Sequence, residues 1–387
     1  MLIIFNMDTL LIQVLFTYFP LKLLIAGNDI GSSLLKACEF LGPVTLGYVI
    51  GKFVDRGSKR VIGKSANFAL ALLMLGFFLF SVGHNSLLVY GVMVMVSLVS
   101  YLSSNLKIVI LPALFDSSKF DRANSLSMIM QNIAGLVSPI VAGILLAAIN
   151  PEPFFLCAAC FYVVSAFLYG KLSPESDVEA NKKDNQLSFV QSIREFLAIK
   201  PLVVMTLMMM GNNAYVGISS LYLIGYAVEC GIVQPEHSAY LLTVGALASI
   251  AAGLTYEKLR GARSYLSVAK FSALMLFISG LVPLFFPNFP GIVVSLLLTG
   301  WFAVFLVVSG WSLRQKIVER SVLGRVAGIT GCFQKLSMVV CIPLAGFLSA
   351  HLGAGAALLF GSLCVLASVA PLFTKAGKKI HQEFILT

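Results

Sequence analysis

The sequence has 387 residues, of which 58% are apolar and 11% are charged, and its formal net charge at pH 7 is +10. Soluble domains carry about 45–50% apolar and about 25% charged residues, so this composition excludes an ordinary soluble protein. The Lys and Arg residues fall on alternate segments between apolar stretches, a pattern that excludes a nucleic-acid-binding surface as the reason for the positive charge.

Apolar stretches of about 20 residues, the length of a helix that crosses a bilayer, recur along the whole chain. Backbone groups in lipid must pair within their own segment, so these stretches are predicted to be helices. In chain order, twelve spans are expected at 3–25, 32–54, 61–82, 86–112, 125–149, 154–170, 202–227, 238–258, 265–286, 291–313, 326–349 and 354–374. The predicted fold class is an all-α membrane protein with its helices in two six-helix bundles.

The predicted domains follow from the longest polar stretch, which separates the sixth span from the seventh. We expect an N-terminal bundle at 1–172, a cytoplasmic linker at 173–200 and a C-terminal bundle with a short tail at 201–387. Apolar residues at helical spacing near the end of the linker predict a helix over 188–199 that lies along the membrane surface. No Lys or Arg precedes Lys22, so 3–25 is interpreted as the first span and not as a cleavable signal.

The distribution of basic residues predicts the orientation in the membrane. Cytoplasmic loops carry an excess of Lys and Arg, so both termini are expected in the cytoplasm, and we expect a multi-pass protein of a bacterial inner membrane. The basic residues of these loops and of the tail are Lys59, Arg60 and Lys64, then Lys119 and Arg122, then Lys171, Lys182, Lys183, Arg194 and Lys200, then Arg260 and Arg263, then Arg320 and Arg325, and finally Lys375, Lys378 and Lys379.

The chain contains an internal repeat, which indicates two copies of one six-helix unit. The segment after the second span recurs after the eighth. Its repeated positions, each 202 residues apart, are Gly51 and Gly253, Asp55 and Glu257, and Arg56 and Lys258. A second set of positions, each 203 residues apart, is Arg122 and Arg325, Gln131 and Gln334, and Gly143 and Gly346.

The segment from Gly51 to Arg60, set among twelve spans in two related halves, resembles the signature loop of the major facilitator superfamily. The resemblance implies transport by alternating access and assigns Gly51, Asp55 and Arg56 to a cytoplasmic gate, with Glu257 and Lys258 as the weaker second copy. A glycine allows close helix approach, and the acid can pair with a base or a helix N-terminus. Arg56, Lys59 and Arg60 are expected at the lipid headgroups, where Lys59, Arg60 and Lys64 serve mainly as topology anchors.

The fifth span, with Pro139 between Gln131 and Gly143, resembles a helix that exporters of this superfamily carry. The segments 121–125 and 323–326 resemble a branch that includes macrolide efflux proteins and enterobactin-type siderophore exporters. This resemblance implies efflux by antiport, and hence siderophore export or drug resistance. Two alternatives remain: a proline kink with small residues that only serves packing, and an importer of a nutrient or metabolite with the same fold.

Ionisable residues inside the spans are costly and therefore mark functional candidates. Asp8 and Lys107 enter the first and fourth spans to a similar depth, which allows them to pair. Glu39 and Lys335 also agree in depth, on the second and eleventh spans, and are predicted to form a bridge between the halves; the alternative is a static pair of Glu39 with Lys36 on its own helix. Asp8 and Glu39 are the candidate proton carriers, because a change in pairing and burial lets a carboxylate bind or release a proton.

Uncharged polar and aromatic residues on the first, fourth, seventh and tenth spans are candidates to line a substrate cavity. Such a lining suits a small amphipathic ligand, and three embedded bases against two acids favour an anionic or zwitterionic one. For any single member, helix packing is the alternative. The candidates are Gln13, Tyr18, Asn105, Asn212, Asn213, Tyr215, Trp301 and Trp311.

Other function classes lack their motifs. The four histidines lie in loops or the tail, and no zinc-protease, nucleophile-elbow or ATP-binding motif occurs, so neither an enzyme nor a metal or cofactor is predicted. Cys157 and Cys160 are interpreted as small buried hydrophobic residues. A non-transporting receptor is a further alternative, but it does not require charges within the spans. The expected partners are a small-molecule substrate, protons and the lipid bilayer, with no nucleic acid and no obligate protein partner.

Overall fold

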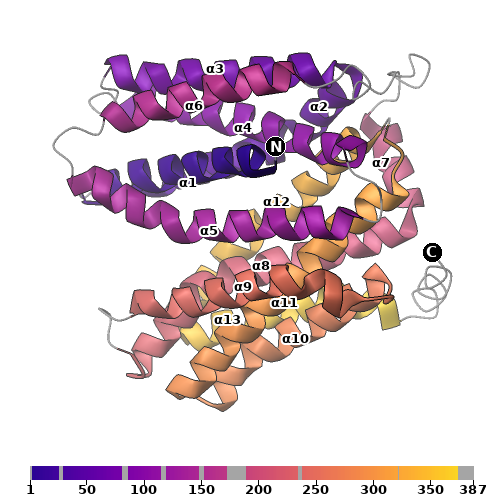
Figure 1. Cartoon of the computed structure of the whole chain (residues 1–387). Coiled ribbons are helices and arrows are strands. Elements are labelled where there is room, and N and C mark those ends of the chain that lie inside the picture. Colours follow the sequence, from indigo (N-terminus) through magenta and orange to yellow (C-terminus); the bar gives the residue numbers. More distant parts are fainter. Residues whose placement is uncertain are drawn as a thin grey trace. The chain divides into compact units, whose positions relative to one another are not determined.

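A computed structural model describes residues 2–25, 29–80, 86–114, 119–147, 152–171, 189–233, 238–320 and 322–373. These residues form a series of α-helices (Figure 1), and the last of them is followed by a short 3-10 helix, Ala370–Phe373. The first six helices are α1 (Leu2–Ile25), α2 (Asp29–Arg56), α3 (Lys59–Phe80), α4 (Ser86–Leu114), α5 (Phe120–Ala147) and α6 (Glu152–Gly170). The others are α7 (Phe189–Ala198), α8 (Lys200–Glu229), α9 (Ser238–Arg260), α10 (Tyr265–Phe285), α11 (Phe289–Ile317), α12 (Leu323–Leu352) and α13 (Ala354–Val369).

The prediction of an all-α membrane fold is confirmed. Apart from the 10-residue α7, each α-helix corresponds to one of the predicted spans. Within the described residues, nine helices are long and apolar enough to cross a membrane. Of the remaining long helices, α2 carries Lys36 and Glu39 within its length. The short α7 lies where the amphipathic linker helix was predicted, and residues 173–188 of the predicted linker lie outside the described residues.

The described helices form two compact units that do not follow the order of the chain. Unit 1 contains 1–118, 133–192 and 318–332, and unit 2 contains 119–132, 193–317 and 333–387. The first turns of α5 therefore belong to unit 2, and the first turns of α12 belong to unit 1. The predicted domain boundaries near 172 and 200 stay a prediction.

In unit 1, α3 lies beside α6, and α1 packs against α2, α4 and α6 (Figure 1). An aromatic cluster forms the core: the ring centroids of Phe19 and Phe77 are 4.9 Å apart, and those of Phe77 and Phe155 are 5.4 Å apart. Contacts of this kind contribute about 0.5–1.5 kcal/mol each beyond their buried area. This core holds α1 in place, and α1 carries Asp8.

In unit 2, α10 lies beside α11, and α8 lies beside α13. Small polar residues bring the helices together, as is typical in lipid, where apolar surface gives little driving force for association. Ser279 Oγ donates to the carbonyl of Ser295 at 2.9 Å, and Ser295 Oγ donates to the carbonyl of Ser279 at 2.8 Å. This reciprocal pair fixes the register of α10 against α11.

Large apolar side chains cover the outer faces of the described helices. Examples are Phe167, which is 66% exposed, and Leu254, which is 70% exposed. Soluble proteins rarely expose apolar surface on this scale, so the outer faces fit a lipid environment. Cys157 and Cys160 lie among these exposed residues on α6, so their predicted burial is wrong. A small apolar thiol is as acceptable against lipid as in a protein core.

Candidate functional site

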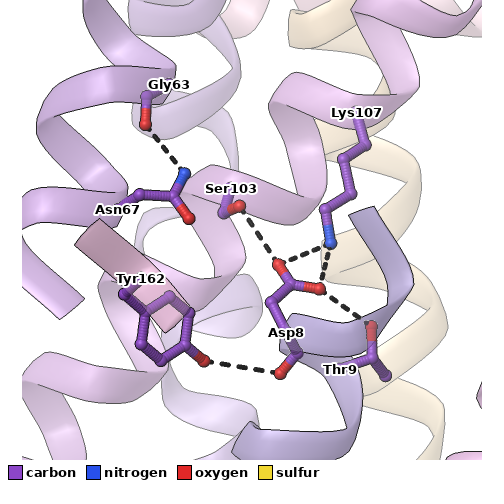
Figure 2. A network of polar contacts seen from close by, with 7 residues as sticks. All are labelled: Asp8, Thr9, Gly63, Asn67, Ser103, Lys107 and Tyr162. Carbon is purple, nitrogen blue, oxygen red and sulfur yellow. Dashed lines mark hydrogen bonds and ion pairs between the residues drawn. The ribbon is translucent and has the colours of Figure 1, made fainter. Parts of the chain in front are cut away.

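A buried ion pair joins α1 to α4 inside unit 1. Lys107 Nζ lies 2.5 Å from Asp8 Oδ1 and 2.6 Å from Oδ2, so the ammonium contacts both carboxylate oxygens (Figure 2). The side chains are only 17% and 10% exposed. The ion pair of Asp8 with Lys107, which the sequence predicts from their similar depth in the first and fourth spans, is therefore present.

Further donors surround the same carboxylate. Ser103 Oγ donates to Asp8 Oδ2 at 3.3 Å, and Thr9 Oγ1 donates to Oδ1 at 3.3 Å (Figure 2). Ser103 and Lys107 lie on one face of α4 because they are four residues apart. From α6, the hydroxyl of Tyr162 reaches the backbone carbonyl of Asp8 at 3.5 Å. The carboxylate of Asp8 is thus held from α1 and α4, and the backbone of the same residue is held from α6.

Two further polar candidates in unit 1 have buried atoms without a hydrogen-bond partner. These are Oε1 of Gln13 and both amide atoms of Asn105, whose side chain is 1% exposed. Buried amide groups are normally satisfied, so these atoms are available to a ligand or to water. Tyr18 instead packs edge-on against Phe155, with ring centroids 6.2 Å apart, which supports a packing role.

The polar candidates in unit 2 divide in the same way. Asn213 Nδ2 donates to the carbonyl of Gln334 at 3.4 Å, and Oδ1 of the buried Asn212 has no partner. The hydroxyl of Tyr215 contacts Ser279 at 3.0 Å within the helix core, which supports a packing role. The half-buried tryptophans also pack: Trp301 stacks on Phe305, and Trp311 lies against the core around Met209.

Asp55, at the end of α2, binds the first turn of α12. Its Oδ1 accepts from the backbone N–H of Gly324 and its Oδ2 from that of Arg325, both at 2.7 Å. The first N–H groups of a helix have no partner within the helix, and the N-terminus carries a partial positive charge, so a carboxylate satisfies both. The guanidinium of Arg325 is 3.4 Å from the same carboxylate.

Glycines allow this contact between α2 and α12. A Cβ added at Gly51 would meet the backbone of Gly324, with the carbonyl carbon at 2.8 Å, and a Cβ at Gly47 would lie 2.9 Å from the carbonyl oxygen of Gly328. Both helices present glycines four residues apart, the spacing that permits close approach of membrane helices. The predicted role of Gly51 in close approach thus has a defined partner.

Lys59 corrects one sequence-based expectation. It was expected at the headgroups, but it is 3% exposed and its Nζ donates to the carbonyls of Val54, Asp55 and Gly57 at 2.8–3.0 Å. The last carbonyls of a helix lack intrahelical donors, and an ammonium group supplies three. Lys59 therefore caps α2, whereas the side chain of Arg56 is exposed as expected.

In the second copy of the repeat, an acid–base contact forms close to Glu257 and Lys258, whose predicted gate role stays a prediction. Glu257 and Lys258 are exposed, and the acid–base contact here is that of Arg260 Nε with Asp121 Oδ2 at 2.6 Å. Asn124 Nδ2, one turn further along α5, donates to Gln315 Oε1 at 2.7 Å. The sequence feature that relates this contact to the first copy is the 203-residue offset, because Asp121 and Gly324 occupy equivalent positions of the repeat.

The remaining charge candidates stay predictions. Glu39 is half-buried on α2 in unit 1, and Lys335 is half-buried on α12 in unit 2. The side chain of Lys36 lies outside the described residues. Among the residues described, no group of three or more His, Cys, Asp or Glu side chains is placed to hold a metal ion.

Comparison with known proteins identifies the family. The family model described as Major Facilitator Superfamily matches residues 1–269, which is more than half of the chain. The chain belongs to the Major Facilitator Superfamily. The family resemblance inferred from the Gly51 segment is therefore confirmed. No curated protein matches the sequence.

Solved structures agree with the superfamily fold. A bacterial homologue of the iron transporter ferroportin, in an outward-facing state, aligns with TM-score 0.70 and 14% identity over 95% of this chain and 98% of its own. The fucose:proton symporter of E. coli aligns with TM-score 0.75 and 14% identity over 95% of this chain and 97% of its own. The human organic anion transporter MFSD10 aligns with TM-score 0.76 and 15% identity over 96% of this chain and 98% of its own. This superfamily member is therefore a multi-pass membrane protein of the secondary-transporter class.

Proposed function

We propose that the chain is a proton-coupled transporter of a small amphipathic or anionic organic molecule, which it moves by alternating access. The observation that carries this proposal is the buried pair of Asp8 and Lys107 on helices from the first sequence half. A carboxylate whose partner changes between two conformations changes its proton affinity, so conformational cycling and proton transfer become linked. Asp8 is the proposed proton carrier, with Glu39 as the second candidate.

The contact of Asp55 with the first turn of α12 is the proposed cytoplasmic gate. In the chain, Asp55 belongs to the first half of the repeat and α12 to the second. Alternating access requires contacts that form on one side of the membrane in one state and break in the other. Gly51 permits this contact, and Arg325 supplements it. The orientation with both termini in the cytoplasm of a bacterial cell is part of the same proposal.

Export is the proposed direction, with siderophores or macrolide-type drugs as cargo. It is supported by the sequence around Pro139 on α5 and by the segments 121–125 and 323–326, which resemble efflux proteins. Import is the second candidate, and the ion pair itself favours it for an anionic cargo. If the anion pairs with Lys107 while Asp8 takes a proton, then both travel in the same direction.

Transport by proteoliposomes that enclose a pH-sensitive dye tests the proposal. The cargo panel contains a macrolide, a catecholate iron chelator and an aromatic carboxylate, each applied as a gradient. We expect one of them to drive proton flux, with the opposite sign for antiport and the same sign for symport. Asp8→Asn should abolish the coupled flux, whereas Glu195→Gln, the same change at an exposed acid of α7, should preserve it.

Proton flux that persists in Asp8→Asn at the wild-type rate would contradict the assignment of Asp8. In that case Glu39→Gln tests the second candidate. If both variants, and the double variant, keep pH-dependent transport, then neither carboxyl carries the coupled proton.

A further inference from the structure

We propose that Lys107, Ser103 and Thr9 form a carboxylate-binding site for the cargo, which the side chain of Asp8 occupies in this structure. The carboxylate of an organic acid replaces that of Asp8 when Asp8 becomes protonated. This inference rests on the import form of the proposed function, the proton-coupled transport of an anionic cargo. It deepens that proposal because it names the cargo class as a carboxylic acid in its anionic form. The three residues are called the Lys107 site below.

The occupant of the Lys107 site shows which chemistry the site recognises. One ammonium group contacts both oxygens of Asp8, and one hydroxyl group approaches each oxygen (Figure 2). An ammonium with flanking hydroxyl donors complements a planar carboxylate, and hydrogen bonds between charged partners are the strong ones. The same donors are equally suited to a carboxylate on a ligand.

The titratable side chains that the structure describes around the Lys107 site are tyrosines and one carboxyl group. From α6, which packs on α1, the titratable side chains near Asp8 are Tyr162, through its contact with the Asp8 carbonyl, and Tyr169. The titratable side chain that α4 contributes near Asp8 is Lys107. The third helix packed on α1 is α2, and it carries the half-buried carboxyl group of Glu39. Among the described side chains that the structure places around Asp8, Lys107 is thus the cationic one.

Charge balance then links proton and cargo. With Asp8 ionised, the site holds one negative and one positive charge. When a proton from water binds the Asp8 carboxylate, the Lys107 ammonium loses the negative charge of this partner, which is unfavourable in a mostly buried position. A cargo carboxylate that enters with the proton restores neutrality. One proton and one anion therefore bind together, without net charge, and would cross the membrane in the same direction.

Chemical rescue in purified protein tests the site without the need for a known cargo. Asp8→Asn leaves Lys107 without its carboxylate, so sodium benzoate should bind this variant at pH 7 and raise its thermal unfolding midpoint. We expect benzoate to bind at least about tenfold more tightly than benzamide, its neutral counterpart, at matched ionic strength. The double variant Asp8→Asn/Lys107→Gln should lose this preference.

The wild-type protein provides a second measurement that does not depend on a variant. In weakly buffered solution at pH 5–6, benzoate should bind together with about one proton per anion, detected as alkalinisation of the medium. Equal effects of benzoate and benzamide on Asp8→Asn, an unchanged preference in the double variant, or benzoate binding to wild type without proton uptake would each overturn the proposal.

The outcomes also separate this inference from the proposed function. If benzoate rescues Asp8→Asn but no cargo drives proton flux in proteoliposomes, then the Lys107 site stands and proton-coupled transport fails. If a cargo without a carboxylate drives proton flux while benzoate gives no rescue, then transport stands and the carboxylate site fails.

Discussion

Asp8 and Lys107 show how a single residue pair can be both costly and informative. Two opposite charges, each mostly buried, stabilise the helix bundle little as a pair, because desolvation offsets most of their attraction. Their removal one at a time is unfavourable, because the remaining charge lacks a partner. A pair of this kind is better explained by a function that exchanges its partners than by stability alone.

A comparison of single and double variants measures this effect. Lys107→Gln leaves the Asp8 carboxylate without its ammonium and should lower the free energy of unfolding by up to about 3 kcal/mol, reduced from the fully buried value because the pair is partly exposed. Asp8→Asn/Lys107→Gln should recover much of that loss. Thermal unfolding in detergent provides the measurement. A double variant no more stable than Lys107→Gln would show that the two charges are not coupled.

Asp55 is the residue for which a pH dependence is expected. It follows the predicted span 32–54, and burial raises its pKa to about 6, although the N–H groups of Arg325 and Gly324 oppose this shift. When α12 moves away, Asp55 faces water and its pKa returns towards 3.8. The carboxyl thus binds a proton more readily in the contact than out of it. The contact is therefore most favoured near pH 4 and is weakened as the pH rises through 6.

Cysteine accessibility at the first turn of α12 tests this sign. Leu323 is fully buried, so Leu323→Cys in a background without other cysteines should react with a maleimide only when the contact opens. We expect its reactivity, relative to that of an exposed cysteine placed at Glu195, to increase between pH 5 and pH 8. The same increase in an Asp55→Asn background would contradict a role for Asp55.

At the level of helices, the close approach of α2 to α12 depends on Gly51. Gly51→Ala would place a methyl group against the backbone of Gly324, which must shift because no flexible side chain can give way. We expect a loss of about 1–3 kcal/mol in stability, measured by thermal unfolding, and greater reactivity of Leu323→Cys. Gly76→Ala on α3 is the matched control, since a Cβ there meets nothing within 4 Å. Equal effects of both changes would refute the packing argument.

The two copies of the repeat make equivalent helix contacts with exchanged charges. In unit 1 the acid ends α2 and the base lies at the start of α12. In unit 2 the acid, Asp121, starts α5, and the base, Arg260, ends α9. Both arrangements place a carboxylate near a helix N-terminus, which is electrostatically favourable. The polarity of the pair can therefore differ between copies while the helix contact is kept.

A double-mutant cycle tests the Asp121–Arg260 contact. Since the Arg260 side chain is 22% exposed, we expect a coupling energy of only about 0.5–1 kcal/mol between Asp121→Asn and Arg260→Gln. Glu257→Gln, the change predicted from the sequence repeat, should be neutral because Glu257 is exposed. If Glu257→Gln destabilises as much as Asp121→Asn, then the second copy uses the residue that the repeat indicated.

At the level of the whole molecule, charge distribution predicts the orientation. An alkaline phosphatase fusion is active only outside the cytoplasm. Fusion after Glu236, in a loop without basic residues, should be active, and fusion after Lys378, in the basic tail, should be inactive. Activity measured in intact cells gives the result. Activity at Lys378 would reverse the predicted topology, and with it the assignment of Asp55 to the cytoplasmic side.

Much of the whole-molecule architecture was predictable from the sequence, because its causes are local. Hydrophobicity summed over about 20 residues determines where a helix crosses lipid, and the repeat determines that there are two six-helix copies. The Asp8–Lys107 pair was also predictable, because the depth of a residue in the membrane follows from its position along the helix and the rise per residue. Family membership followed from the spans, the repeat and the Gly51 segment.

Only the tertiary structure decided which side chains meet. Helix periodicity does not tell which neighbouring helix a face contacts. It therefore did not predict that Lys59 turns inwards and caps α2. It also did not predict the ion pair of Asp121 with Arg260. The same holds for the first turns of α5 and α12, which join the unit opposite to their sequence half. Burial and pairing are properties of packed helices, whereas the sequence alone determines the helices themselves, the repeat and the charges they carry.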